Sequence, residues 1–294
     1  MKLTHIRNLV AVAEHGSLRA AARALDVTQP ALTRSITTLE EELAVPLLQR
    51  SARGVILTSY GDAFLARART IWSEVARAKE EAAQLRGERE GSVTISVSFA
   101  AAALLVPPAL KAFQRTHPNV QIRVSNAPLR VALTDLRHGR LDFVAAPLPE
   151  EPLGKELESS LLFLNEIVVV VRKGHRKAQA TSLGELADER WAVSGPGAVV
   201  KDAFARAGLS GPKIGLFFDS YHGLERMIAG TDLVGTMPKQ LLLAGETRAL
   251  LEPLRLRQRL APLRVSLICR SDAPLTPVAD SFATLMKRAA RRFV

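Results

Sequence analysis

Apolar residues recur at the spacing of amphipathic helices through the first part of the chain. Three such helices are predicted, from about residue 3 to 15, from 18 to 24, and onward from Thr28. Gly16 suits a helix C-terminus, and Ser17 and Thr28 suit the N-cap positions of the second and third helices. The turn at 25–27 is short enough to force a steep crossing, as in a helix-turn-helix. The buried stripes are Leu3, Ile6, Val10 and Ala13; Leu18, Ala21, Ala22 and Leu25; and Leu32, Ile36, Leu39 and Leu43.

The third helix leaves a polar face toward solvent, and no acidic residue lies on it before Glu40. Amide, hydroxyl and guanidinium groups at the N-terminal end of a helix pair with base edges and phosphates in the DNA major groove. An ordinary solvated face is the alternative. The predicted DNA-contacting residues on this helix are Thr28, Gln29, Pro30, Thr33 and Arg34.

Two short strands, 47–50 and 55–57, are predicted around a basic tip. This hairpin is typical of the wing of a winged helix-turn-helix. Arg50 and Arg53 would lie beside the third helix, where a guanidinium reaches phosphate or the minor groove. Solvated surface arginines are the alternative for each one singly.

A long helix is predicted over 59–87, because apolar residues follow Thr58 in alternating steps of four and three. A helix of this length is about 42 Å long, and its seam exceeds what a small winged domain covers. We therefore predict a dimer interface, with packing on the helix's own domain as the alternative. The seam consists of Phe64, Ala68, Ile71, Val75, Ala78, Ala82 and Leu85.

A polar break between Gly87 and Gly91 separates this helix from a series of alternating strands and helices. The series predicts an α/β domain over 91–294, and the fold class is therefore multi-domain, α+β with α/β. The first domain, a winged helix-turn-helix, spans 1–58. Among the elements expected in the last domain are a helix at 104–117 and a helix at 183–189.

Open α/β sheets bind ligands beyond the carboxyl ends of their strands, which selects a small set of loops. Two of these loops open helices, whose unpaired N–H groups favour an anion. The effector is therefore expected to be a small organic anion, and no cofactor or metal is expected. The candidate effector-binding residues are Ser98, Phe99, Asn126, Ser194, Gly195, Pro196, Gly197, Phe218, Tyr221 and Met237.

The distribution of charge along the chain bears on both predicted binding sites. The net charge is +11, but residues 1–90 carry 13 Lys and Arg against 11 Asp and Glu, so the excess of basic residues lies mostly beyond them. This excess is consistent with an anionic ligand of the C-terminal domain, and a basic solvated surface is the alternative. The absence of a signal peptide or a long apolar span predicts a cytoplasmic protein without a membrane partner. Cys269, the only cysteine, lies in an apolar run and is expected to be a buried thiol.

Catalytic motifs are missing from the sequence. It has no G-x-S-x-G, H-E-x-x-H, P-loop or paired C-x-x-C, and the adjacency of Asp219, Ser220 and His222 argues against a triad. We therefore expect that the protein is not an enzyme. A solute-binding or enzymatic α/β domain with an accessory DNA-binding head is the alternative.

The run GSLRAAARALDVTQPALTRSITTLEEELAVPLLQR from Gly16, with Leu57-Thr58 and Gly61 after it, resembles the DNA-binding segment of LysR-type transcriptional regulators. Ala44 and Leu48 stand where many members have Gly and Phe, a volume change in a packed turn. The resemblance implies that the long helix links the head to a type II periplasmic-binding-protein fold. One lobe would comprise 91–162 and 268–294, the other 163–267, with the effector between them.

Three short strings, LRG at Leu85, GPGA at Gly195 and TMP at Thr236, resemble the branch that includes regulators of aromatic sulfonate degradation, such as toluenesulfonate. The resemblance implies an aromatic anion as effector and a sequence-specific operator in double-stranded DNA. It further implies a homotetramer, RNA polymerase as a partner, and an effect of the ligand on DNA bending and transcription.

Overall fold

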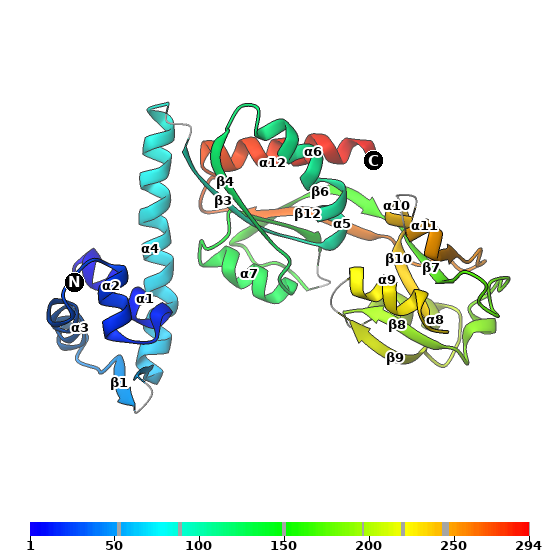
Figure 1. The fold of residues 1–294 in the computed structure, drawn as a ribbon, viewed down its shortest axis with the longest axis horizontal. Coiled ribbons are helices and arrows are strands. Elements are labelled where there is room, and N and C mark those ends of the chain that lie inside the picture. Colours follow the sequence, from blue (N-terminus) through cyan, green and yellow to red (C-terminus); the bar gives the residue numbers. More distant parts are fainter. Residues whose placement is uncertain are drawn as a thin grey trace.

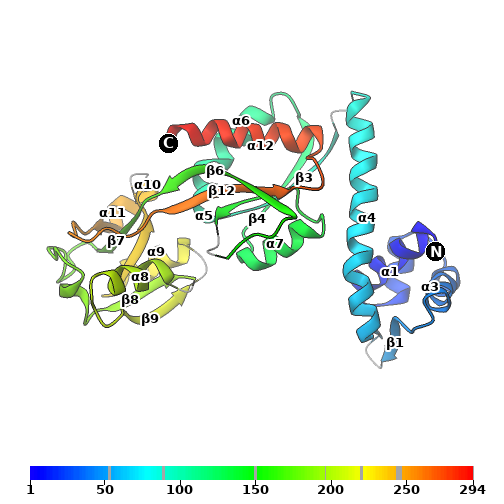
Figure 2. The ribbon, with the colours of Figure 1, turned by 180° about the vertical axis from the view of Figure 1, so that it is seen from behind.

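The computed structural model describes residues 1–51, 54–87, 90–148, 151–195, 197–218, 221–242 and 247–293, without the side chains of residues 50, 51, 221 and 222. The chain forms an N-terminal head, one long helix and a two-lobed C-terminal domain (Figure 1). The long helix stands between the head and the first lobe, as the view from behind also shows (Figure 2). The multi-domain fold class predicted from the sequence is confirmed.

The head is a winged helix-turn-helix. Its three helices pack around the buried side chains of Leu9, Leu32 and Leu39. Ser17 and Thr28 cap the second and third helices by accepting hydrogen bonds from the N–H groups of Ala20 and Ala31. The elements are α1 (Leu3–His15), α2 (Leu18–Ala24), α3 (Gln29–Leu43) and an antiparallel hairpin of β1 (Leu48–Ser51) and β2 (Gly54–Leu57).

Helix α4 (Ser59–Leu85) begins at the N-cap Thr58, whose hydroxyl accepts a hydrogen bond from the N–H of Gly61. Its first half packs on the head, where Leu65 and Ala68 are buried in the core of that domain. Its second half lies against the first lobe (Figure 1). One helix therefore touches both the head and the effector domain of the same chain.

Lobe I, the first lobe, is built on a five-stranded mixed sheet of order β4-β3-β5-β12-β6. One face of the sheet is covered by α5, α6 and α12, and the other by α7 (Figure 2). The strands are β3 (Glu90–Val97), β4 (Asn119–Ser125), β5 (Phe143–Pro147), β6 (Leu157–Asn165) and β12 (Leu263–Arg270). The helices are α5 (Phe99–Leu104), α6 (Val106–Phe113), α7 (Leu129–Arg137) and α12 (Pro277–Ala290), followed by the 3₁₀ turn η2 (Arg291–Phe293).

Lobe II carries a second five-stranded sheet, of order β11-β7-β10-β8-β9. Trp191 is fully buried on one face, against Phe204 of α8, and α9 covers the other face. The strands are β7 (Ile167–Arg172), β8 (Arg190–Ser194), β9 (Lys213–Phe218), β10 (Val234–Pro238) and β11 (Leu251–Pro253). The helical elements are η1 (Gly184–Leu186), α8 (Ala198–Arg206), α9 (Tyr221–Ala229), α10 (Lys239–Leu242) and α11 (Thr247–Leu250).

Strands β6 and β12 connect the two lobes. They pair antiparallel from Asn165 opposite Leu263 to Leu157 opposite Arg270. The lobe divisions expected at 162/163 and 267/268 fall inside these strands, because an apolar alternation looks the same on either side of a domain junction. Among the described residues, no helix is both long and apolar enough to cross a membrane.

Two helices expected in the C-terminal domain are wrong in detail. The helix expected at 104–117 is interrupted at Leu105, and α6 restarts with Pro107 and Pro108 in its first turn. Proline lacks the N–H that would continue the preceding helix, which explains the break. The helix expected at 183–189 is only the 3₁₀ turn η1. Strand β6 and helix α9 had no counterpart among the sequence predictions.

Candidate DNA-binding and effector-binding sites

The outer face of α3 presents the side chains predicted to contact DNA. Gln29, Pro30 and Arg34 are exposed and Thr33 is half-buried. These four residues, with Thr37, Thr38 and Glu41, line an open hollow along the helix. Thr28 is exposed, and its hydroxyl oxygen is used as the N-cap. The structure therefore brings the predicted residues of α3 together on one accessible face.

Glu40, the first acidic residue on the outer side of α3, is turned away from that face. Its Oε1 accepts hydrogen bonds from the backbone N–H groups of Leu47 at 2.7 Å and Leu48 at 2.9 Å. The carboxylate thereby fixes the start of the wing against α3. The side chain of Arg50 and the whole of Arg53 lie outside the described residues, so the predicted basic tip stays a prediction.

The seam predicted on α4 divides into two parts. Ala68 is fully buried and Phe64 half-buried in the core of the chain's own head, so the prediction that Ala68 contacts a partner is wrong. Packing within one chain and packing between two chains give the same heptad spacing, so the sequence pattern does not distinguish a dimer interface from a contact with the chain's own head. Val75 is half-buried. Exposed members of the seam are Ile71, Ala78, Ala82 and Leu85.

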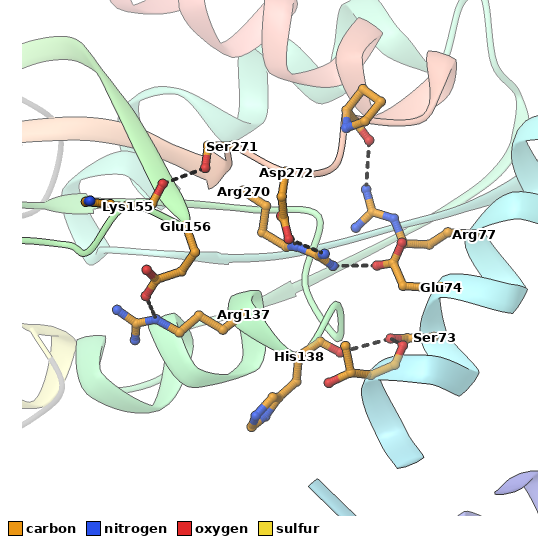
Figure 3. Close-up of polar contacts among 12 residues, drawn as sticks. Ser73, Glu74, Arg77, Arg137, His138, Lys155, Glu156, Arg270, Ser271 and Asp272 are labelled. Atoms are coloured by element: carbon orange, nitrogen blue, oxygen red, sulfur yellow. Dashed lines mark hydrogen bonds and ion pairs between the residues drawn. The ribbon is translucent and has the colours of Figure 1, made fainter. Parts of the chain in front are cut away.

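A second stripe on α4, which the sequence pattern did not reveal, contacts lobe I, and Figure 3 shows two of its members, Ser73 and Arg77. Ser73, Arg77, Glu80 and Gln84 are spaced four, three and four residues apart, as in a heptad. They lie about 150° around the helix from the exposed apolar stripe. Their polar character hid this stripe from a search for apolar periodicity, but the spacing itself is visible in the sequence.

In lobe I, the candidate effector residues lie at the carboxyl ends of β3 and β4. Ser98 caps α5, accepting a hydrogen bond from the N–H of Ala101 at 3.4 Å, and Phe99 after it is half-buried. Asn126 is exposed, and its side-chain amide donates a hydrogen bond to the carbonyl of Val97 at 2.6 Å. Ser98 and Asn126 are therefore neighbours at one edge of the sheet.

In lobe II, β8 ends at Ser194 and α8 begins after Gly197. Gly197 is the N-cap of α8 in the left-handed region (φ 68°), and no side chain caps the helix. A Cβ atom at Gly195 would meet nothing within 4 Å, whereas one at Gly197 would lie 3.0 Å from Val193 Cγ2 and 3.2 Å from Ile214 Cδ1. Gly197 is therefore required by its backbone conformation and by close packing, and its place in the effector site stays a prediction. Pro196 lies outside the described residues.

The residues expected to form apolar walls of the effector site differ in their burial. Met237 is 1% exposed within the core under α9, so its assignment to the ligand surface is wrong. Strand β10 is central in its sheet and covered on both faces, which the sequence alone does not reveal. Phe218 is half-buried at the end of the edge strand β9 and stays a candidate. The side chain of Tyr221 lies outside the described residues, as do those of the triad considered at Asp219, Ser220 and His222.

Burial shifts the acidity of several groups around lobe I. Desolvation raises the pKa of Asp142 and Glu80 and lowers the pKa of His138. Burial likewise raises the pKa of the Cys269 thiol to about 11. Asp142 and Glu80 lie at the contact between α4 and lobe I. In the described ranges, no three His, Cys, Asp or Glu side chains gather where they could hold a metal ion.

A helix-turn-helix head joined to a two-lobed domain defines the class of ligand-responsive DNA-binding proteins. Residues 3–62 match the family of bacterial regulatory helix-turn-helix proteins of the lysR type. Residues 86–291 match the LysR substrate-binding domain. The chain therefore belongs to the LysR family of transcriptional regulators, as the sequence resemblance predicted. It is a DNA-binding transcriptional regulator with an effector-binding domain, and this family is not one of enzymes.

Known regulators are similar to this protein over most of its length. The transcriptional regulator GbpR of Rhizobium radiobacter is 30% identical over 85% of this chain and 86% of its own. The SDS degradation transcriptional activation protein of a Pseudomonas species is 29% identical, covering 97% of this chain and 95% of its own. Full-length CbnR, solved with its target DNA, has the same fold, with a TM-score of 0.70 at 21% identity, covering 98% of this chain and all of its own (100%).

Proposed function

We propose that the outer face of α3 reads the operator of this regulator, with Gln29, Pro30, Thr33 and Arg34 at the major groove. The exposed, acid-poor N-terminal half of α3 supports the proposal. The carboxylate of Glu40 is bound by the backbone of the wing, and Glu41, which lines the hollow, lies toward the C-terminal end of the helix. Arg50 and Arg53 of the wing hairpin are proposed to grip the minor groove or the backbone beside it.

Arg34→Ala and Gln29→Ala test this role. Each is expected to weaken operator binding by about 1 to 3 kcal/mol, the size of a lost base or charged phosphate contact. Arg206→Ala on α8 in lobe II is the matched control, because it removes the same charge from an exposed side chain far from α3. Unchanged operator affinity of both α3 variants, in proteins that melt normally, would falsify the assignment.

We further propose that the effector is a small organic anion held between the lobes. The uncapped N-terminus of α8 offers unpaired N–H groups, with open space at Gly195. Ser98 and Asn126 lie at the carboxyl edge of the other sheet, where open sheets bind ligands. A relative named for activating the degradation of SDS, an alkyl sulfate, and the resemblance to regulators of aromatic sulfonate degradation favour sulfated or sulfonated compounds.

A thermal-shift screen tests this ligand class, using benzoate, 4-toluenesulfonate and a short alkyl sulfate against neutral sugars. An organic anion is expected to stabilise the protein, with a smaller effect in Ser98→Ala. Because Ser98 also caps α5, Ser17→Ala is the matched control: it removes an N-cap from α2 without touching the effector domain. Stabilisation by sugars alone would overturn the proposal.

The oligomer and its action on transcription complete the proposed function. The exposed stripe Ile71, Ala78, Ala82 and Leu85, with Val75, is proposed to pair with its copy in a second chain. Two such dimers would form a tetramer on an interrupted palindrome. The effector would then alter DNA bending and let RNA polymerase engage. Footprinting with and without the bound anion checks this step, which an unchanged footprint and bend would contradict.

A further inference from the structure

The segment that follows β11 carries a row of exposed arginines. Residues 254–262 contain three arginines and no acidic residue, and the arginines occupy alternate positions. All three are exposed to solvent. In both views the segment, which follows α11 and β11 in the ribbon, lies at the end of lobe II away from the DNA-binding head (Figure 1 and Figure 2). The arginine row consists of Arg255, Arg257 and Arg259.

The backbone that carries the arginine row is fixed to the rest of lobe II. Leu254 and Leu260, at the two ends of the row, are buried in the core of this lobe. The N–H of Leu254 donates a hydrogen bond to the carbonyl of Val169 at 2.9 Å, and the N–H of Arg257 donates one to the carbonyl of Thr181 at 2.8 Å. An ordered backbone presents the three guanidinium groups together, which lowers the entropic cost of binding a partner there.

The charges of the arginine row are not neutralised within lobe II. In the part of the chain that the structure describes, none of the three side chains forms an ion pair or a hydrogen bond. Other arginines of the same lobe do, since Arg172 pairs with Asp232 at 2.6 Å and Arg206 with Asp202 at 2.8 Å. Glu185, on the segment that contacts the row, accepts hydrogen bonds from neighbouring backbone and hydroxyl groups instead.

Such a row is better suited to binding than to folding. Like charges in one short segment repel one another and therefore cost stability. The planar guanidinium group binds a carboxylate through two parallel hydrogen bonds, and arginine is enriched in protein interfaces. The operator is proposed to lie on α3, at the other end of the chain (Figure 1). The position of the row thus favours an acidic protein partner over operator DNA.

We propose that the arginine row is a docking surface for an acidic segment of a second protein. Carboxylates at alternate positions of an extended segment face one side, and they pair with the three guanidinium groups. The inference goes beyond the proposed function, because the row belongs neither to the operator-reading face nor to the effector site. It gives lobe II a protein-binding role while α3 holds the operator.

Fluorescence anisotropy on the full-length protein tests the surface with a labelled peptide. The probe is a peptide of about 12 residues with glutamate at alternate positions, and the same peptide with glutamine is the neutral reference. The parent should bind the acidic peptide and not the neutral one. The triple variant Arg255→Ala/Arg257→Ala/Arg259→Ala should weaken binding about tenfold, because each exposed ion pair contributes only a few-fold. A parent that does not bind the acidic peptide overturns the proposal.

The matched control removes the same charge elsewhere in the effector domain. Lys111→Ala/Arg115→Ala/Lys201→Ala takes three exposed cations, none with an ion pair among the described residues, from α6, the turn after it and α8. This variant should bind the acidic peptide about as tightly as the parent. An equal loss in the control would mean that net charge alone attracts the peptide, and it would overturn the proposal.

A labelled DNA duplex of random sequence is the second probe. Its affinity should be the same in the row variant and in the control variant. A row variant that loses duplex binding and keeps peptide binding would make the row a nucleic-acid surface, against the proposal. A benzophenone group on the acidic peptide locates the site directly: photo-crosslinks should map to residues 251–264, and crosslinks confined to α3 would contradict the assignment.

Thermal melts separate a docking role from a structural one. Because repulsion within the row is relieved, the triple alanine variant should melt at the same temperature as the parent or higher. A lower melting temperature, with the control variant unchanged, would show that the arginines stabilise lobe II itself and would overturn the proposal.

Discussion

A Cβ atom added to Gly61 would lie 2.1 Å from the carbonyl oxygen of Leu47 and 3.0 Å from its carbonyl carbon. The first turn of α4 thus rests directly on the backbone that leads into the wing. Thr58 strengthens the contact, because its hydroxyl donates a hydrogen bond to the carbonyl of Pro46 at 2.6 Å. Wing and linker helix share one junction, so the orientation of the wing depends on the absence of a side chain at position 61.

Gly61→Ala is therefore expected to destabilise the head by about 1 to 3 kcal/mol, the usual cost of overpacking against a rigid neighbour. Operator affinity should fall as well, because the wing must shift. A Cβ atom at Gly184 would meet only Ser182 Oγ, at 3.9 Å, so Gly184→Ala is the matched control and should change stability little. Thermal melts and gel shifts on both variants check this, and equal melting temperatures would contradict it.

Ala44 ends α3 in the left-handed conformation, with φ 56° and ψ 25°. Many family members have a glycine at this position, where the left-handed backbone strains an alanine. The side chain of Ala44 is exposed, so the expected volume change in a packed turn does not apply to it. Ala44→Gly should stabilise the protein by about 0.5 to 1 kcal/mol, the relief of strain less the added entropy of the unfolded chain. Ala76→Gly, at an exposed position within α4, should instead destabilise by about 1 kcal/mol. Chemical denaturation measures both signs, and a loss of stability in Ala44→Gly would refute the strain argument.

Val75→Asp is expected to weaken the dimer by about a hundredfold or more, because an unpaired charge in an apolar interface costs about 3 kcal/mol or more. Ile71→Asp should act in the same way. Lys79→Asp, on an exposed position outside the seam, is the control for charge alone. Sedimentation of the full chain gives the dissociation constants. A parent protein that stays monomeric at working concentration would remove the basis for the interface.

Acid should weaken the protein in part through His138, whose pKa is lowered from its usual value of 6.5 by burial and then by Arg140, against the opposite effect of Asp135. Below pH 6.5 the unfolded chain takes up a proton that the folded chain refuses. Stability is therefore lost as the pH falls from 6.5 toward the folded pKa of His138. His138→Gln should flatten this part of the pH profile and leave stability above pH 7 nearly unchanged. Melting curves between pH 5 and 8 decide it, and identical slopes in both proteins would count against the assignment.

Asp142 and Glu80 act in the opposite sense. Desolvation raises their pKa values, so the ionised forms cost stability, and this cost disappears as each carboxyl takes up a proton on acidification. Asp142→Asn should remove the contribution of Asp142 to the acid profile. It should also weaken the contact with Arg77, whose charge would lose its partner.

The spacing of apolar and capping residues was enough to predict the helices of the head and the linker helix from the sequence alone. Apolar residues at period 3.6, with Ser17, Thr28 and Thr58 before them, determine where each helix begins, because capping and amphipathic burial act within a few residues. The exposed polar side of α3 follows from its buried stripe. The period-2 runs likewise predict most strands of the two lobes, and the family resemblance supplied their overall architecture.

Only the tertiary structure decided which surface covers each of these elements. Ala68 and Ile71 have the same heptad character, yet one is buried in the head and the other is exposed. Met237 reads as a pocket residue until the order of strands places it in a core. Arg270 and Glu74 are 196 residues apart and share no local signal, so their contact exists only through the packing of α4 on lobe I. Burial and long-range pairing depend on what the rest of the chain brings alongside, and periodicity within one segment contains no information about that neighbour.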